Sequence, residues 1–467
     1  MKRSRTIAVA AMSAFGLILA GCRSAPALSH SAPKPQVPAA SSEIRQASYE
    51  DEAAADAPRD ADDPFVGLTV LSVEAVVSAV QSRNPSIQAA SAAWSAAAQK
   101  YPQAVALDDP TFQSMLAPRS LSGASNVPAS FYVGVAQPLT WPGKRELRGN
   151  QANWESAAAM YDYSEVQVHL AESARLAFFD YFLSSRLREL NSANRVATGD
   201  FRRLALSRYE ANLASQNDVL QADVEIAKLE QKQIEIEQDR AVAIARLNTL
   251  MHRRPEHPLP EPLQSLTTDN ELPSLANLQQ TAEQNRPELQ ALAARVQAEM
   301  SAIAIACKEY YPDFEVMARY DQFWFEKEQQ PQLGLNMNVP LNRSKRAAAV
   351  REAQARAAKA QAEYEQARDT LRNDIASAYA RTAGSDKSIR LFETKLLPTA
   401  KQNLETAQAG YEAGTLDFLR VIEAQRQVIE LREQRQMQVV ELHRRRTVLE
   451  RAVGTGLAHD LPNSSGQ

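Results

Sequence analysis

Residues 411–417 read YEAGTLD, and the tripeptide YEA also occupies residues 209–211, which is 202 positions earlier. Each copy of the tripeptide comes at the end of a long stretch with helix-forming composition and directly before a short polar turn. A second long helical stretch follows each turn. We therefore predict that the chain contains two helical hairpins, and that residues 212–215 and 414–417 form their turns.

The separation of 202 positions holds at other landmarks along the chain. The matching pairs are Asn84-Pro85 with Arg286-Pro287, Pro110 with Pro312, Pro138-Leu139 with Pro340-Leu341, and Ala222 with Ala424. Landmarks that keep one register over such a length indicate a tandem duplication. We predict one copy at 68–255, a Pro-rich bridge at 256–269, a second copy at 270–455 and a disordered tail at 456–467.

The helices of each hairpin are predicted to be unusually long. Between Lys144 and about Ser207 there is no proline, and a helix of that length would reach roughly 95 Å. Its antiparallel partner is predicted at 217–250, where apolar residues recur with heptad spacing. These residues are Val219, Ala222, Ile226, Leu229, Ile236, Ala243, Leu247 and Leu250, with Gln233 and Arg240 as interruptions. Residues 421–431 begin the same seam, so we expect coiled-coil hairpins that pack side by side.

In each copy a helix of about 30 residues, at 71–100 and at 275–309, is predicted to lead into a pair of strands. Residues 313–321 and 332–339 alternate between apolar and polar side chains; 131–135 does the same, and 111–117 is less regular. Such segments fit a transmembrane barrel with a wet lumen. A half-buried soluble sheet has the same period and remains the alternative. The aromatic residues at the strand ends, where a membrane interface is expected, are Trp141, Phe323, Trp324 and Phe325.

Four strands are too few to close a barrel. Unpaired backbone groups in hydrocarbon each cost several kcal/mol, so a sheet embedded in lipid cannot leave its edges open. Membrane barrels begin at about eight strands. The chain therefore needs at least one further copy of itself, and three copies would supply about twelve strands.

The N-terminus has the features of a secretion signal. Basic residues at positions 2, 3 and 5 precede an apolar stretch, Ile7 to Leu19, which is too short to span a bilayer. It ends in Leu19-Ala20-Gly21-Cys22, which resembles a bacterial lipobox and implies cleavage after residue 21 and lipidation of Cys22. Residues 22–67, rich in Pro, Ala, Ser and acidic residues, are predicted to be a flexible linker. No intrachain disulfide is then possible for Cys307, which is expected to be a small buried apolar residue.

Composition and motifs exclude several functions. The formal net charge is −4, and removing the three basic residues of the signal peptide leaves 49 basic against 56 acidic residues, which does not favour binding to nucleic acid. The six histidines lack metal-ligand spacing, and no phosphate-binding loop or nucleophile-elbow motif occurs. We expect no catalytic residue, no cofactor and no metal site, and therefore no enzyme.

Together these features resemble the TolC-type outer membrane efflux proteins. The resemblance rests on the lipobox, the twofold repeat, residues 137–139 (QPL) with 141–145 (WPGKR), and residues 411–417, and it covers about 68–455. It implies a homotrimer with a twelve-stranded β-barrel in the outer membrane and an α-helical barrel in the periplasm. It further implies a passive exit duct for small molecules or metal ions, which docks with a periplasmic membrane-fusion adaptor and is driven by an inner-membrane pump.

The resemblance also carries expectations about individual residues. The hairpin turns would contact the adaptor, through Asn212, Leu213, Gly414, Thr415, Leu416 and Asp417. The simpler interpretation is that Gly414 ends one helix and Asp417 caps the next.

A closed state would be held by a latch between Tyr411 and Asp218, in which Leu416 stands where the family has an arginine. Arg420 and Glu423 match pore-facing acidic positions, although the first is basic here, and both could simply be solvated helix surface. Two alternatives to the efflux duct stay open: an exit duct for type I protein secretion, and a lipid-anchored periplasmic coiled-coil scaffold without a pore.

Overall fold

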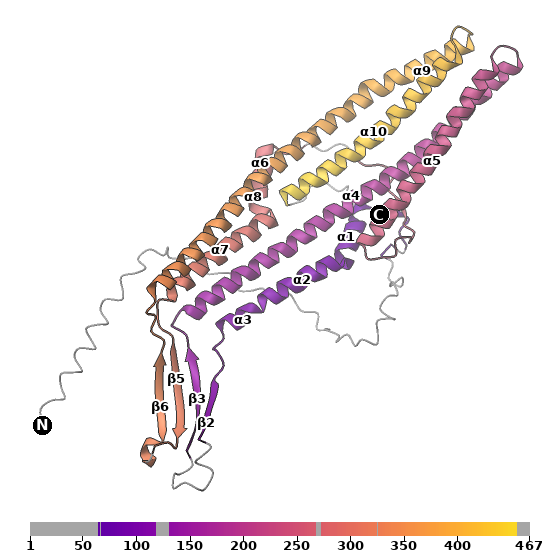
Figure 1. Ribbon diagram of the computed structural model, residues 1–467. Coiled ribbons are helices and arrows are strands. Elements are labelled where there is room, and N and C mark those ends of the chain that lie inside the picture. The colour runs from indigo at the N-terminus through magenta and orange to yellow at the C-terminus, as the bar shows by residue number, and fades with distance from the viewer. Residues whose placement is uncertain (1–63, 66, 118–129, 268–271, 325, 455–467) are drawn as a thin grey trace, which may run out of the picture. The chain divides into compact units, whose positions relative to one another are not determined.

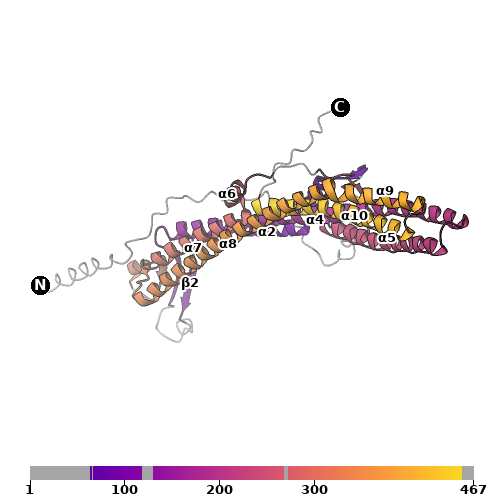
Figure 2. The same cartoon turned by 90° about the horizontal axis from the view of Figure 1, so that it is seen from above.

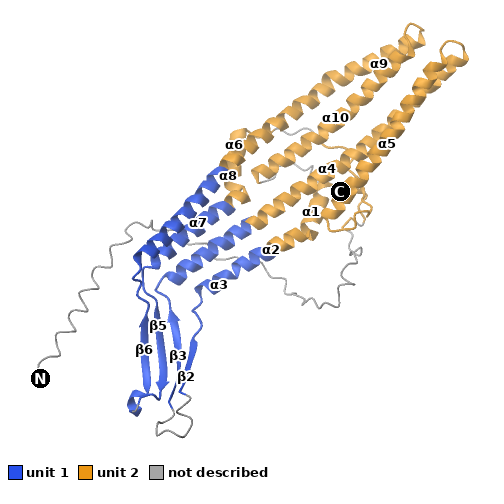
Figure 3. Ribbon diagram, in the orientation of Figure 1, with its two compact units in different colours: residues 1–40, 92–161, 291–366 blue, residues 41–91, 162–290, 367–467 orange. Residues whose placement is uncertain are grey.

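The computed structural model describes residues 64–65, 67–117, 130–267, 272–324 and 326–454. The predicted signal peptide, Cys22, almost all of the predicted linker, Phe325 and the predicted tail lie outside these residues. The described chain forms two compact units (Figure 3). Unit 1 contains residues 92–161 and 291–366, and unit 2 contains the described residues up to 91, then 162–290 and those from 367 onward.

Long helices dominate both units (Figure 1). The first hairpin consists of α4 (Lys144–Glu210, 67 residues) and α5 (Gln216–Leu250). The second consists of α8 (Arg343–Leu391), a π-helical segment (Phe392–Leu396), α9 (Leu397–Glu412) and α10 (Phe418–Val453). In unit 2, α9 and α10 lie side by side in both views (Figures 1 and 2). The predicted fold class, mostly α with a small β portion, is confirmed.

The element bounds repeat with the separation seen in the sequence. Helices α1 (Val73–Arg83) and α6 (Leu275–Asn285) begin at residues 73 and 275. Helices α5 and α10 begin at residues 216 and 418, and α4 and α9 end at residues 210 and 412. All of these pairs are 202 residues apart, so these helix ends keep the register of the repeat.

The prediction of one continuous helix before each strand pair is wrong. The first is divided into α1, α2 (Pro85–Ala98) and α3 (Lys100–Val105), and the second into α6 and α7 (Pro287–Lys308). Both copies break at a residue that precedes proline, because the proline ring disfavours the helical conformation of that residue. Asn84 and Arg286 accordingly have extended ψ angles of 124° and 116°.

The four strands of unit 1 form one antiparallel sheet. They are β2 (Thr111–Leu116), β3 (Phe131–Leu139), β5 (Phe314–Asp321) and β6 (Pro331–Met337), in the order β2-β3-β5-β6. Their bounds lie within a few residues of the predicted ones. The register sets Val135 between Phe112 and Ala318, and Val316 beside Leu335, so that apolar residues of all four strands share one face.

A buried lysine fixes the corner between the sheet and α4. Lys144 is fully buried, and its Nζ lies 2.9 Å from both carboxylate oxygens of Asp313. Asp313 also accepts a hydrogen bond from the backbone N–H of Trp141, whose ring stacks on Tyr311 at 5.1 Å. Gly143 makes the turn with a φ of 86°, which glycine adopts without the steric cost that Cβ imposes. The WPGKR segment therefore builds a strand-to-helix corner.

In unit 2 the predicted seam of α5 is largely buried. Six of its eight residues are buried, while Ile226 and Leu250 are half-buried. The two polar interruptions have partners: Gln233 accepts a hydrogen bond from Asn191 at 3.0 Å, and Arg240 donates to the Tyr181 hydroxyl at 3.0 Å. No helix among the described residues has both the length and the apolar composition needed to cross a membrane.

The Pro-rich bridge is part of the folded body. Strands β1 (Val70–Leu71) and β4 (Glu261–Pro262) pair in parallel, and the Tyr181 hydroxyl donates to the carbonyl of Pro260 at 3.1 Å. Phe65, which we placed in the linker, is 3% exposed and belongs to the core of unit 2. Cys307, which was expected to be buried, is only half-buried.

One hairpin contains an irregularity that the other lacks. The π-helical turn at residues 392–396 lies just before Pro398, whereas the equivalent part of α4 is continuous. Proline has no N–H to donate to the carbonyl of Thr394, four residues earlier, and a helix interior adjusts to such a gap by a local change of winding. The proline therefore accounts for the position of the π-helical turn.

Candidate functional site

The two hairpin turns have the same backbone structure. Asn212 and Gly414 both have positive φ angles, 56° and 73°. The N–H of the residue after each bonds a carbonyl five residues back, Leu213 to Arg208 at 2.8 Å and Thr415 to Gly410 at 2.9 Å. This is the Schellman ending of a helix, with a left-handed residue after the last turn.

The interpretation that Gly414 ends a helix is therefore correct, and Asp417 occupies the N-cap position of α10 without a side-chain capping bond. The predicted tip residues lie in these turns and are exposed. They are Asn212, Leu213, Gly414, Thr415, Leu416 and Asp417. Leu213 is 68% exposed and Leu416 is 41% exposed. Two turns of the same geometry that each present a leucine to solvent are a suitable contact surface, and their role as adaptor contacts stays a prediction.

Tyr411 and Asp218 are in contact, as expected for a latch between hairpins. The Tyr411 hydroxyl donates to Oδ2 of Asp218 at 3.3 Å, and the tyrosine side chain is 4% exposed. Its ring packs on Phe418 at 5.2 Å, within a core that both hairpins share. Burial first, and then the negative charge of Asp218, raise the pKa of Tyr411 above its ordinary value of 10.0. The tyrosine thus stays neutral and able to donate at neutral pH.

An arginine from another position lies beside Tyr411. Leu416, which stands at the arginine position of the family, packs its side chain over Gly410. The guanidinium of Arg208 lies 4.7 Å from the centre of the Tyr411 ring and donates to the carbonyl of Glu412 at 2.7 Å. Sequence reasoning missed Arg208, because its position in the first copy corresponds to a glycine in the second and no pattern marks it.

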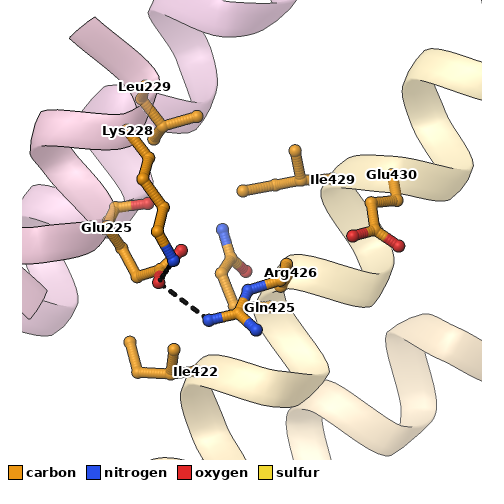
Figure 4. Close-up of a pocket in the computed structure, with 9 residues that line it drawn as sticks. Glu225, Lys228, Leu229, Ile422, Gln425, Arg426, Ile429 and Glu430 are labelled. Carbon is orange, nitrogen blue, oxygen red and sulfur yellow. Dashed lines mark hydrogen bonds and ion pairs between the residues drawn. The ribbon is translucent and has the colours of Figure 1, made fainter. Parts of the chain in front are cut away.

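A second polar contact joins the hairpins farther from the turns. Glu225 on α5 accepts hydrogen bonds from Arg426 on α10 at 2.7 Å and from Lys228 at 2.8 Å. Burial would raise the pKa of Glu225, but these two hydrogen bonds hold the pKa below its ordinary value of 4.5. The ion pair borders a cavity of about 270 Å³, toward which Ile422 and Gln425 also point (Figure 4).

The Glu225–Arg426 pair was also missed by sequence reasoning. Glu225 follows the seam residue Ala222 by three positions, and Arg426 follows the equivalent Ala424 by two. Opposite charges at distances from the two turns that differ by one residue were the available signal.

Arg420 and Glu423 lie on one face of α10 and pair with each other. Their side chains are 70% and 47% exposed, and Nη1 of Arg420 lies 3.2 Å from Oε2 of Glu423. Because Arg420 lies beside the Glu423 carboxylate, this face of α10 is not purely acidic. A role at the pore aperture stays a prediction for both residues.

The sheet of unit 1 has a second candidate surface, the apolar sheet face. Its residues are Phe112, Val133, Val135, Val316, Ala318, Tyr320, Leu333, Leu335 and Met337, all exposed. The opposite face carries Gln113, Glu315, Arg319, Gln332 and Asn336. A contiguous exposed apolar face on one side of a sheet marks contact with lipid or protein.

In the part of the chain that the structure describes, no three His, Cys, Asp or Glu residues gather to hold a metal ion. The predicted lipidation residue, Cys22, lies outside that part.

A family model and several solved structures of outer-membrane channels match this chain. The family model of the outer membrane efflux protein matches residues 76–252 and 278–455. The fold is similar to the outer-membrane channel OprN (19% identity, TM-score 0.71, covering 84% of this chain and 91% of that one). It is also similar to VceC from Vibrio cholerae (19%, 0.70, 83% and 97%) and to CusC (16%, 0.72, 82% and 92%). No curated protein matches the sequence. At these identities the likeness to solved structures establishes the fold.

Proposed function

Because the chain belongs to the outer membrane efflux protein family, we propose that it forms the passive exit duct of a tripartite efflux system, driven by an inner-membrane pump. Its cargo would be small molecules or metal ions. A periplasmic membrane-fusion adaptor would contact the hairpin turns, and lipid on Cys22 would anchor the chain to the outer membrane.

The observation that carries this proposal is the four-stranded sheet with one exposed apolar face and two open edges. Leu333, Leu335 and Phe112 are 88%, 65% and 72% exposed on that face. Lipid would cover these side chains, and the polar face with Arg319 and Glu315 would line a wet lumen. Since β2 and β6 have no outer partner in the described sheet, closure in a membrane requires further copies. Three copies give a homotrimer with a twelve-stranded barrel.

The helices support the same assembly. Helix α5 buries its seam inside the protomer and exposes a second apolar stripe. Leu220, Val224, Ile234 and Val242 form this stripe and are 53%, 54%, 59% and 69% exposed. Their spacing of 4, 10 and 8 residues keeps them on one helix face, opposite the buried seam. A helix of the partner subunit would cover this stripe and continue the wall as an α-helical barrel.

The duplication supplies the repeating element of that wall. We propose two copies at about 68–255 and 270–455, preceded by a cleaved signal peptide (1–21) and a tether (22–67). Each copy contributes one hairpin and two strands, so three chains would present six equivalent hairpins and six strand pairs around the duct. The latch residues Tyr411 and Asp218 would hold neighbouring hairpins together when the duct is closed.

The test uses the full-length lipidated protein, purified in detergent and then placed in planar lipid bilayers. We expect light scattering to give the mass of three chains and the bilayer to show stepwise ionic conductance. A stable monomer without conductance would contradict the duct and favour the coiled-coil scaffold. Small-molecule efflux and type I secretion use different inner-membrane transporters. The transporter that co-purifies with the protein therefore distinguishes the two functions.

A further inference from the structure

The two open edges of the sheet are complementary in direction. Strands β2 and β6 are the outer strands of an antiparallel sheet with the order β2-β3-β5-β6. Alternation along this order makes β2 and β6 run in opposite directions, so β6 of one subunit can pair antiparallel with β2 of another. The C-terminal end of β6 and the N-terminal end of β2 then meet at the same rim of the sheet, where the helices of unit 1 begin and end.

The β6 edge continues beyond its own partner strand. Its paired residues end at Met337, but the alternation of exposed apolar side chains runs on through Val339 (50% exposed) and Leu341 (84% exposed). Strands in a closed barrel are staggered from one to the next. The backbone N–H of Asn338 still donates to the carbonyl of Asp313 at 3.0 Å, and residues 339–341 lie beyond this last bond. Residues 339–341 are therefore suited to lie beside the first residues of β2 of the partner subunit.

Opposite charges flank these two edges at the same rim. Asp108 and Asp109 directly precede β2, and Arg343 and Lys345 follow β6. All four residues are exposed, and within the described residues none of the four side chains forms an ion pair. Residues 329–351 contain no acidic residue at all, so the basic side chains have no neighbouring carboxylate on their own segment.

The basic pair is also unfavourable for its own helix. Arg343 and Lys345 lie in the first turn of α8, and this turn contains no acidic residue. The helix dipole is positive at that end and disfavours cations there. Within the described protomer neither cation has an ion-pair partner, and a carboxylate from outside the protomer would offset this repulsion.

From these observations we propose that Asp108 and Asp109 of one subunit pair with Arg343 and Lys345 of the partner subunit and so set the register of the edge that closes the sheet. The inference rests on the trimer proposed above and adds the residues that join its subunits. A slip of β6 against β2 would separate the charges and turn side chains to the wrong face, so the charge pairs would select one register.

The experiment is a charge exchange in the full-length lipidated protein. One variant carries Arg343→Glu with Lys345→Glu, a second carries Asp108→Lys with Asp109→Lys, and a third carries all four substitutions. The readout is the temperature at which the trimer dissociates in mild detergent. We expect each reversal alone to lower this temperature by several degrees and the combination to restore most of the loss. Arg351→Glu, two turns farther along α8, is the matched control and should leave the temperature unchanged.

A crosslink provides a second measurement. Asp109→Cys combined with Lys345→Cys, in a chain with Cys307→Ser, should give covalent dimers and trimers on mild oxidation, and either cysteine alone should give no covalent trimer. If the wild type forms a trimer but the four-substitution variant is not rescued and the double-cysteine variant gives no crosslink, the charge pairing is overturned. The proposed duct would still stand. Absence of the trimer from the wild type would instead overturn the proposed function. A defect that depends on anionic lipid and is not rescued would assign the basic pair to the membrane surface, against the proposal.

Discussion

At the scale of single residues, Tyr411 links the two hairpins most directly. Its ring is buried between them, and its hydroxyl reaches Asp218 on the other hairpin. A hydrogen bond to a charged acceptor contributes about 1.5 kcal/mol at the lower end of the usual range, and the distance of 3.3 Å places this bond at that end. A contact of this strength would be enough to bias the proposed closed state and weak enough for a partner to release.

We predict that Tyr411→Phe together with Asp218→Ala raises the conductance of the purified protein in planar bilayers. Loss of about 1.4 kcal/mol favours the open state roughly tenfold. Because the pKa of Tyr411 is raised above 10.0, the hydroxyl keeps the proton that it donates up to pH 10 and loses it only as the pH rises above that value. Tyr209→Phe, the equivalent tyrosine of the first copy, is the control. Equal conductance of the double variant and the wild type would contradict the latch between Tyr411 and Asp218.

The lowered pKa of Glu225 predicts that acid weakens the contact between the hairpins. Its pKa is held below the ordinary 4.5, so its contribution to the closed form is present above about pH 4.5 and is lost as the pH falls through the lower folded value. We expect conductance to rise in that acidic range and Glu225→Gln to abolish this rise. Glu235→Gln, on the same helix and exposed, should titrate like the wild type. An unchanged acid response in Glu225→Gln would exclude this ion pair as a contact that holds the hairpins.

At the scale of elements, the turns depend on backbone conformation more than on side chains. Gly414 ends α9 with a φ of 73°, and its equivalent Asn212 has a φ of 56°. Glycine adopts this region freely, and asparagine tolerates it better than most residues. The two copies thus form the same turn with different residues. At this position the repeat therefore keeps its backbone geometry although the residue types differ.

Gly414→Ala is predicted to destabilise the second hairpin by about 1 kcal/mol, because alanine is strained in the left-handed region. The matched control is Gly384→Ala within α8, where an added Cβ meets nothing within 4 Å. That variant should gain up to about 1 kcal/mol from helix propensity. Thermal unfolding followed by circular dichroism should therefore shift in opposite directions for the two variants. A shift in the same direction would mean that the turn conformation does not limit stability.

At the scale of the whole molecule, the two faces of the sheet decide where the protein resides. Adjacent residues of β6 point to opposite faces, so neighbouring positions test the two environments separately. Leu335 lies on the apolar sheet face and is 65% exposed, whereas Asn336 lies on the polar face and donates a hydrogen bond to Glu315 at 2.9 Å.

Leu335→Lys is predicted to impair membrane insertion, since a lysine on the lipid side of a barrel costs about 2–4 kcal/mol near the bilayer centre. Asn336→Lys, one residue away, should insert normally because it would face water in the lumen. The measurement is the fraction of protein that urea extracts from isolated membranes. Similar extraction of both variants would show that neither face contacts lipid.

Patterns that act over a few residues were enough to predict most of the architecture. Alternation with a period of two predicted the strands, heptad spacing predicted the seam of α5, and the 202-residue separation predicted two equivalent hairpins. The same local information was available where the prediction failed, because Asn84 and Arg286 each precede a proline that ends a helix. These features depend on backbone sterics and on side-chain direction, which neighbouring residues determine.

Contacts between distant residues were decided only by the tertiary structure. Lys144 and Asp313 are 169 positions apart, and Glu225 and Arg426 are 201 apart. Many exposed charges could have formed such pairs, and the paths of the helices select which ones do. The resemblance predicted Tyr411 with Asp218, yet Arg208 beside that tyrosine appeared only in the fold. Sequence alone therefore determined the elements and their repeat, while the packing of the elements decided which charged and aromatic side chains meet.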